Sequence, residues 1–462
     1  MNSKKFKAAA STVIAGRFYW AIGVSFVLMG LFFSTTTKIQ AADGDLDVTF
    51  GNGGKVLVDF SATSEYGRSV VVQPDGKIIV AGQSGTYPLF HSALVRFNAN
   101  GTLDESFGVG GKALLPLDPN GDGLSSVALQ PDGRIVVAGS QIHDNFTVGL
   151  LVARCNSNGS LDQTFGNGGS VLFSFGDSGS QGNAVVVQAD GKIIVVGQTG
   201  ASYGELVDIA IARFNSDGAF DNTYGANGKT RTHFPGQFNT GSRATSAALQ
   251  TDGKLVVAGG YKNEGTPGEF ALARYETSGK LDPTFGAGGI VHTSLGSAES
   301  TAMSVGVQTD GRIVAAGYFY TAHRNKDFAL ARYNANGTLD VSFGKGGIII
   351  SDLFGTSDDI AYGLCIQRDN KLVVIGRSGM YPNFRAAVVR YNRSGSFDSG
   401  FGMAGKVMTD FGSLSSQFYG AALQPDGKIV VAGYSSASTS DIAVARYIAR
   451  TIRLSSSTTA GD

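Results

Sequence analysis

The sequence of 462 residues contains 66 glycines, about twice the usual share of this residue. Hydrophobic residues make up 42% of the chain and charged residues only 16%, which excludes a disordered polyelectrolyte. Lys and Arg together number 37, as do Asp and Glu, and this balance excludes a basic nucleic-acid-binding protein. Because only 10 prolines are present, the glycines do not belong to a collagen repeat.

Residues 1–41 have the layout of a secretory signal peptide. Three lysines and Arg17 precede an apolar run over residues 18–33, and small residues follow at the predicted cleavage site near Ala41. We therefore expect an exported protein in the periplasm, at the cell surface or outside the cell. An uncleaved anchor is the alternative, and the only membrane contact we expect, although 16 apolar residues are fewer than the roughly 20 of a membrane span.

Three signatures recur in step along the rest of the chain, each of them seven times. The first is Q-x-D-G, which begins at Gln73, Gln130, Gln188, Gln250, Gln308, Gln367 and Gln424, at intervals of 57 to 62 residues. The second is an arginine, usually before an aromatic residue: Arg96, Arg154, Arg213, Arg274, Arg332, Arg390 and Arg446. The third is LDxxFG, with Asp47, Asp104, Asp162, Asp221, Asp282, Asp340 and Asp398. A repeat of this length indicates a solenoid or a propeller.

Each repeat unit contains four stretches that are typical of short strands. In the first unit, residues 69–73 and 77–82 flank the turn Pro74-Asp75-Gly76, which predicts a hairpin. Residues 93–97 and 111–115 supply the third and fourth strands. Four strands per unit without helical stretches predict an all-β, seven-bladed β-propeller with four-stranded blades over residues 46–447, followed by a short polar tail at 448–462.

The phase of the repeats predicts how the ring closes. One strand, residues 55–60, precedes the first Q-x-D-G, and the last unit stops one strand short, after residues 443–447. We expect the strand at 55–60 to complete the last blade, which would leave no open edge.

The spacing of the second and third signatures predicts buried ion pairs. Each of the first six repeated arginines lies eight residues before an LDxxFG aspartate. A half-buried guanidinium needs a carboxylate, so we expect each to pair with that aspartate. Arg446 has no such partner, and we expect it to pair with Asp47. The aromatic residue of LDxxFG is predicted to pack between blades.

The linked motifs LDxxFGxGGK, QPDGKIVVAG and ALARYN resemble the delta-60 repeat, which is found in exported bacterial proteins. The resemblance covers nearly the whole chain after the leader and implies a β-propeller and export rather than a particular activity. Small departures occur where Cys155 replaces the aromatic residue, Asn370 replaces a glycine, and Phe220 and Phe397 replace the leucine.

One face of the predicted ring carries the loops that vary among the repeats, and we expect it to hold the binding surface. Its aromatic and charged side chains suit recognition of a protein or polysaccharide at the cell surface by a monomer, with no nucleic acid involved. The candidate binding residues are Tyr87, His91, His143, Tyr203, Tyr318, Tyr320, His323, Arg324, Tyr381, Arg385 and Tyr434.

One loop of this face has a pattern typical of calcium loops. Asp118, Asn120 and Asp122 are spaced as D-x-N-x-D-G, which directs three side-chain oxygens around a glycine turn. Integrin-type propellers have a similar loop, usually with an aspartate at the position of Ser126. A polar turn without metal is the alternative, and we expect no other cofactor.

No catalytic residue stands out. The single tryptophan, Trp20, lies in the leader, and the five histidines show no metal-binding spacing. The function we favour is therefore a non-catalytic exported binding scaffold. An envelope lyase or hydrolase built at the channel mouth from residues such as His91, His143 and His323 is one alternative, and a purely structural surface protein is another.

The two cysteines, Cys155 and Cys365, lie at framework positions of different repeats. An exported protein could pair them, but these positions favour two small buried side chains over a disulfide.

Overall fold

The computed structural model describes residues 41–62, 64–86, 89–117, 121–142, 148–175, 179–200, 207–234, 243–263, 265–321, 325–355 and 357–450. All of them belong to one compact unit that spans residues 41–462. Almost all of the predicted signal peptide, and the predicted tail beyond residue 450, lie outside the described residues. Within the described ranges there is no helix long and apolar enough to cross a membrane.

The described residues form twenty-eight strands in seven four-stranded blades. Blade 1 contains β2 (Ser64–Val72), β3 (Ile78–Thr86), β4 (Leu89–Phe97) and β5 (Lys112–Leu114); blade 2 contains β6 (Asp122–Leu129), β7 (Ile135–Ile142), β8 (Val148–Cys155) and β9 (Ser170–Phe173); blade 3 contains β10 (Ser180–Val187), β11 (Ile193–Thr199), β12 (Asp208–Phe214) and β13 (Lys229–Thr232). Blade 4 contains β14 (Arg243–Leu249), β15 (Leu255–Tyr261), β16 (Glu269–Tyr275) and β17 (Ile290–Thr293); blade 5 contains β18 (Ser300–Val307), β19 (Ile313–Tyr320), β20 (Lys326–Tyr333) and β21 (Ile348–Ser351). Blade 6 contains β22 (Ile360–Ile366), β23 (Leu372–Met380), β24 (Asn383–Tyr391) and β25 (Lys406–Thr409); blade 7 contains β26 (Ser415–Leu423), β27 (Ile429–Ser436) and β28 (Ser440–Tyr447), and β1 (Lys55–Val58) pairs with β28.

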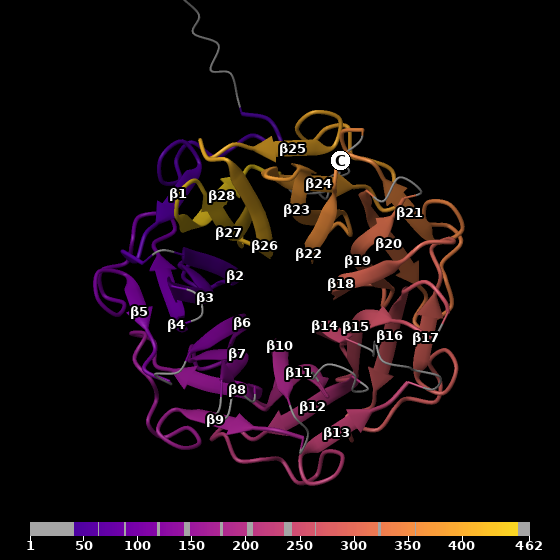
Figure 1. The fold of residues 1–462 in the computed structure, drawn as a ribbon, viewed down its shortest axis with the longest axis horizontal. Helices are drawn as coiled ribbons and strands as arrows, with labels where there is room; N and C mark the ends of the chain where they lie inside the picture. Colours follow the sequence, from indigo (N-terminus) through magenta and orange to yellow (C-terminus); the bar gives the residue numbers. More distant parts are fainter. Residues whose placement is uncertain are drawn as a thin grey trace, which may run out of the picture. The chain divides into compact units, whose positions relative to one another are not determined.

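The blades are arranged around a common centre. The strands β2, β6, β10, β14, β18, β22 and β26 are innermost (Figure 1). Blades 1 and 7 are joined by a single parallel bridge between Ser64 and Ser440, and this bridge makes their eight strands formally one sheet. Seven four-stranded units in this arrangement fit the seven-bladed propeller that the repeats predict.

Seven hydrophobic clusters lie between neighbouring blades and hold them together. The cluster between blades 7 and 1 joins Val430 and Ile442 to Val80, and it includes Phe50 from the first LDxxFG turn. All seven aromatic residues of these turns are buried, as predicted: Phe50, Phe107, Phe165, Tyr224, Phe285, Phe343 and Phe401. The core is therefore distributed over seven seams rather than gathered in one place.

The Q-x-D-G signature forms the turn between the two innermost strands of each blade. In blade 1 the Gly76 N–H donates to the Gln73 carbonyl over 2.9 Å, and Gly76 takes a positive φ of 86°. In blade 6 Asn370 stands at the glycine position with a φ of 62°. Asn tolerates this conformation better than most residues, so the departure from the motif leaves the turn intact.

The predicted arginine–aspartate pairs are confirmed. In the first six pairs the arginine Nε donates to the aspartate Oδ2 over 2.7 to 2.9 Å. The Arg446 Nη2 lies 2.8 Å from Asp47 Oδ2, although the two residues come from opposite ends of the chain. Each guanidinium also lies over the aromatic ring of an LDxxFG turn, as Arg446 does at 4.7 Å from the Phe50 centroid.

The N-terminal strand β1 pairs antiparallel with β28, from Lys55 opposite Ala445 to Val58 opposite Ile442. It is two residues shorter than the strand predicted at 55–60. The chain turns directly after it, because the Ser61 N–H donates to Asp59 Oδ1 and Ser61 takes a positive φ of 64°. This turn ends the strand and leads the chain to β2.

Candidate functional site

Each innermost strand carries one β-bulge at the same place in the repeat, where its register with the next strand shifts. A bulge leaves one extra residue outside the regular ladder and redirects its side chain. The extra residues are Arg68, Ser125, Asn183, Thr245, Met303, Tyr362 and Tyr419, and all are partly exposed. The repeated framework therefore presents six different types of side chain, with tyrosine twice, at one position of the innermost strands.

A second variable position lies in the second strand of each blade, directly after its repeated glycine, which is Gly82 in β3 of blade 1. This glycine is dictated by space, since a Cβ on Gly82 would lie 1.8 Å from the Tyr66 carbonyl oxygen. The residues that follow it are Gln83, Ser140, Gln198, Gly260, Tyr318, Arg377 and Tyr434. Each pairs with the residue two positions before the bulge, as Gln83 pairs with Tyr66. These positions form a second variable layer beside the bulges.

Aromatic rings from blades 6, 7 and 1 meet at these two layers. Tyr362 and Tyr419 are bulge residues whose ring centroids lie 4.9 Å apart. Tyr434 lies 6.2 Å from Tyr419 and 5.0 Å from Tyr66 between ring centroids. The Tyr66 ring in turn lies 6.0 Å from that of Phe90. We call Tyr66, Tyr362, Tyr419 and Tyr434 the tyrosine cluster.

Arg68 lies against two rings of the tyrosine cluster. Its guanidinium carbon is 4.5 Å from the Tyr419 centroid and 5.3 Å from the Tyr66 centroid. Within the described part of the chain it makes no hydrogen bond or ion pair. The arginines of the repeated signature differ, because each of them has a carboxylate partner. The donors of Arg68 are therefore available to a ligand.

Arg377 places a second guanidinium beside the cluster. Its Nη1 donates to Gln417 Oε1 over 3.1 Å, and its guanidinium carbon lies 3.8 Å from the Phe384 centroid. The buried Nε has no hydrogen-bond partner among the described residues. Burial raises the pKa of Tyr362 and Tyr434 despite the opposing charge of Arg377. Both phenols are thus neutral donors at pH 7.

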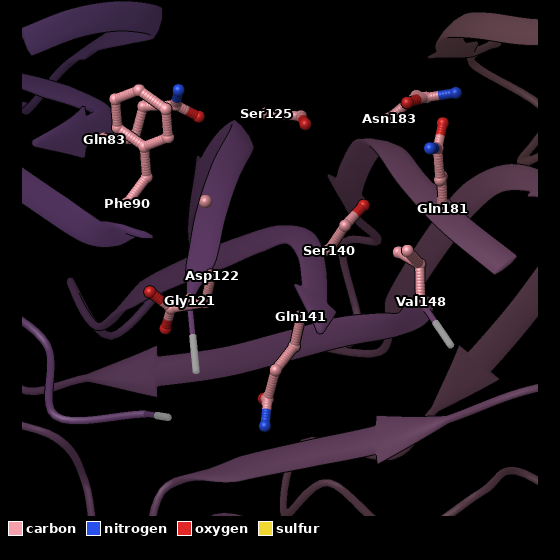
Figure 2. Close-up of a pocket in the computed structure, with 11 residues that line it drawn as sticks. Gln83, Phe90, Gly121, Asp122, Ser125, Ser140, Gln141, Val148, Gln181 and Asn183 are labelled. Carbon is pink, nitrogen blue, oxygen red and sulfur yellow. The ribbon is translucent and has the colours of Figure 1, made fainter. Parts of the chain in front are cut away.

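A polar pocket of about 270 Å³ adjoins the tyrosine cluster at Phe90. Figure 2 shows Gln83 and Phe90 on one side of this pocket and Gln181 and Asn183 on the other, with Ser125 and Ser140 between them. The Asn183 Nδ2 donates to the Ala244 carbonyl over 2.7 Å, which fixes this side chain. We call this the amide pocket, defined by Gln83, Ser125, Ser140, Gln181 and Asn183.

The tyrosine cluster and the amide pocket suit a ligand with rings, hydroxyl groups and negative charge. Aromatic faces bind apolar faces of rings, and a guanidinium binds a carboxylate or sulfate through paired donors. Amide and hydroxyl side chains donate to and accept from hydroxyl groups.

Among the predicted binding residues that the structure describes, only Tyr434 belongs to the tyrosine cluster. Tyr318 and Tyr320 contact each other at 5.7 Å in blade 5, and Lys326 Nζ lies 5.0 Å from each ring centroid. His91 lies in β4 opposite Ser84.

Two other predicted residues lie on blade 6. Tyr381 is 86% exposed and its ring contacts that of Phe384. Arg385 lines a separate cavity of about 430 Å³ together with Met380 and Phe354. The Phe384 ring connects this surface to Arg377, because it contacts both Tyr381 and the Arg377 guanidinium.

The remaining predicted residues lie outside the described residues: Tyr87, His143, Tyr203, His323, Arg324, Asp118 and Asn120. Of the three predicted calcium ligands only Asp122 is described. It is buried, and its Oδ1 accepts the Ser92 N–H over 2.6 Å. Calcium binding by this loop stays a prediction.

Sequence reasoning missed Arg68, Tyr362, Arg377 and Tyr419. A signal for them exists in the sequence. When the seven copies are aligned on Q-x-D-G and on the glycine of the following strand, the residue after that glycine and the residue five positions before the glutamine both differ among the repeats. Arg68 stands five positions before Gln73, and Tyr419 stands five before Gln424.

Comparisons with solved structures find distant likenesses to this chain. A protein of unknown function from Dyadobacter fermentans is 12% identical, with a TM-score of 0.45 over 86% of this chain and 98% of its own. The polysaccharide lyase Uly1 is 13% identical, with a TM-score of 0.49 over 90% of this chain and 94% of its own. Sqt1 of Chaetomium thermophilum, bound to the N-terminus of the ribosomal protein L10, is 13% identical, with a TM-score of 0.45 over 85% of this chain and 98% of its own. At these values the three structures carry no argument about activity.

No curated protein matches the sequence. The family described as "Domain of unknown function (DUF5122) beta-propeller" matches residues 73–107, 130–165, 188–224, 250–285, 308–343, 367–401 and 424–447, together just over half of the chain. The delta-60 repeat that the sequence resembles is a repeat of this type. The chain therefore belongs to the DUF5122 β-propeller family.

Proposed function

We propose that this protein is an exported, non-catalytic β-propeller that binds an acidic polysaccharide at the tyrosine cluster and the amide pocket. The observation that carries the proposal is Arg68, whose guanidinium lies between the rings of Tyr66 and Tyr419 and has no carboxylate partner among the described residues. A partly buried cation held in this way favours an anionic ligand.

The surroundings of Arg68 support a saccharide rather than a simple anion. Arg377 adds a second cation, and no described carboxylate pairs with either guanidinium. The tyrosine rings offer faces for sugar rings, and the amide pocket offers donors and acceptors for hydroxyl groups. Uronic acids and sulfated sugars combine these three features in one residue of a polymer.

A protein partner is the second candidate, and a different surface favours it. Met380, Tyr381 and Phe354 of blade 6 are 65%, 86% and 50% exposed, beside the cavity that Arg385 lines. Exposed apolar side chains near a cavity are typical of protein-binding surfaces.

An envelope hydrolase or lyase is the rival from another class. Its best support is the His233 Nδ1, which lies 2.8 Å from Asp208 Oδ1, while the Arg231 Nε lies 2.5 Å from Asp208 Oδ2. This pair is on β12 and the segment after β13, at the outer part of blade 3, and not at the innermost strands. We therefore assign it to the structure of the blade.

We also infer that β1 closes the ring by completing blade 7. The pairing of β1 with β28 and the ion pair between Asp47 and Arg446 support this. Export and cleavage near Ala41 remain part of the proposal, and they would leave Asp43 and the whole of β1 in the mature protein.

The test is isothermal titration calorimetry of the purified full chain with oligogalacturonate as the acidic saccharide and a neutral oligosaccharide of equal length. We expect binding of the acidic saccharide that weakens as salt is added, because charge contributes to it. Equal binding of both saccharides, or release of reducing ends from either, would contradict the proposal.

A further inference from the structure

Three carboxylates meet at the junction of blades 7 and 1. Asp59 directly follows β1, Glu65 lies in β2, and Asp441 lies in β28. One oxygen from each lies within 4.8 Å of the others. The segment that follows β1, the innermost strand β2 and the strand β28 therefore contribute one acidic group each to the same point.

The negative charge at this point is not neutralised by the described residues. None of the three carboxylates makes a salt bridge with a residue in the described ranges. The Lys112 Nζ reaches the carbonyl oxygen of Asp59 but not its carboxylate. Burial and the neighbouring carboxylates raise the pKa of Glu65 and Asp441.

Glu65 supplies an independent sign that a ligand is missing. Its side chain is 0% exposed, and its Oε1 accepts the Ala62 N–H over 3.0 Å. The Phe60 backbone N–H also acts on this carboxyl group and opposes the rise of its pKa, but Oε2 is buried and has no hydrogen-bond partner of normal geometry among the described residues. A buried carboxylate oxygen without a partner is costly, so this atom calls for a cation or a proton.

A second acidic group occupies the same three repeat positions and serves as an internal comparison. Asp352 follows β21 as Asp59 follows β1, and Asp327 precedes Arg332 by five residues as Asp441 precedes Arg446. In this group Asp359 takes the place of Glu65, but both of its oxygens are satisfied. Its Oδ2 accepts the Leu353 N–H and its Oδ1 accepts the Ser357 hydroxyl, each over 2.7 Å.

We propose that Asp59, Glu65 and Asp441 bind one Ca²⁺ ion. The ligands are all carboxylate oxygens, which suit hard cations and not zinc or copper. Three carboxylates supply up to six oxygens, and Ca²⁺ accepts six to eight in flexible geometry, whereas Mg²⁺ requires a near-ideal octahedron. The partner-free oxygen of Glu65 places the ion at this junction rather than at Asp359.

The position of the site gives the ion a structural role. It would join the segment that leaves β1 to the start of β2 and to β28, which are the parts of the chain that meet only when blades 7 and 1 are side by side. An ion that binds only this arrangement stabilises the folded state by mass action. The proposal is independent of saccharide binding.

The test uses the full chain freed of divalent ions with a chelator, then titrated with CaCl₂ at pH 7 by calorimetry and by thermal unfolding. We expect one binding event that raises the midpoint of unfolding, with little response to MgCl₂. Asp59→Asn and Asp441→Asn should each weaken this event by about tenfold or more, since each loses a charged ligand. Asp59 is exposed, so its substitution leaves folding intact.

Asp327→Asn is the matched control, because it changes the equivalent position of the second acidic group. It should leave the binding event in place, and so should Asp118→Asn in the predicted calcium loop. Unchanged calcium binding in Asp59→Asn and Asp441→Asn would overturn the proposal. A wild-type chain that shows no calcium response, but whose stability changes with pH in a manner removed by Asp441→Asn, would show that a proton occupies the site instead.

Discussion

The Arg446 Nη2 lies 2.8 Å from Asp47 Oδ2, so the last strand of the chain and the first described turn share a buried ion pair. The same pair recurs six times within the chain between residues eight positions apart. Arg446 and Asp47 are 399 positions apart in sequence, 446 against 47, and they make the same interaction.

Asp47→Asn is expected to destabilise the protein as much as Asp340→Asn does in blade 5. Each substitution leaves a buried arginine without its counter-charge, which costs about 3 kcal/mol. Urea unfolding measures both, with Asp132→Asn as the control, since Asp132 forms only an exposed pair with Arg134. A cost for Asp47→Asn near that of the control would show that the N-terminal turn does not hold the ring.

Acid is expected to destabilise the protein by protonating the seven aspartates of the LDxxFG signature. Burial alone would raise the pKa of Asp47, but hydrogen bonds from Thr49 and Lys428 and the charge of Arg446 outweigh it and lower the pKa to about 2. The pKa values of the other six aspartates of the LDxxFG signature are also lowered. A carboxyl group whose pKa is lower in the folded state stabilises the fold at pH values above its unfolded-state pKa, which is near 4. This stabilisation is lost as the pH falls through the folded-state pKa.

The free energy of unfolding, measured in urea from pH 7 to pH 2, should therefore fall steeply below about pH 4 as these aspartates take up protons. A profile that stays flat down to pH 2 would contradict the role assigned to the seven pairs.

Gly376→Ala is expected to prevent folding or to cost more than about 4 kcal/mol. A Cβ at this position would lie 1.8 Å from the Ile360 carbonyl oxygen, and that backbone belongs to the innermost strand. Gly400→Ala is the control, because the closest atom to its Cβ is Asp398 Oδ1 at 3.6 Å. Circular dichroism reports whether each variant folds, and thermal unfolding measures its stability. A folded Gly376→Ala variant of normal stability would contradict the close packing of Gly376 against Ile360.

The two cysteines are expected to be unreactive in the native protein. Both are free thiols, as the sequence predicts, and burial raises the pKa of each to about 12. Ellman's reagent should detect no thiol in the folded chain and both thiols in guanidinium chloride. No thiol after denaturation without reductant would mean that a disulfide has formed.

The framework was predictable because it is repeated. Seven copies of Q-x-D-G and LDxxFG predict the hairpin turns, the four-stranded units and the ion pair of Arg446 with Asp47. The length of the first strand was not predictable from its apolar pattern, because the turn at Ser61 ends it two residues early.

The site was harder to predict because it depends on exceptions to the pattern. Strict alternation along a strand places side chains on two faces, but a bulge shifts the register by one residue and changes the face. Arg68 and Tyr362 occupy such bulges, and the loops do not reveal them. Tyr434 was predicted because it lies at a strand end that sequence reasoning treated as loop.

The most direct test of the proposed function is calorimetry of oligogalacturonate binding to the wild-type chain, Arg68→Ala and Arg312→Ala. Arg312 pairs with Asp310 and Asp340 at the Q-x-D-G end of the ring, and its substitution is the matched loss of an arginine away from the tyrosine cluster. We predict that Arg68→Ala weakens binding about tenfold to a hundredfold, as expected for a lost charged hydrogen bond, with no change in thermal stability. Equal affinity in all three proteins would contradict the assignment of the tyrosine cluster as the binding site.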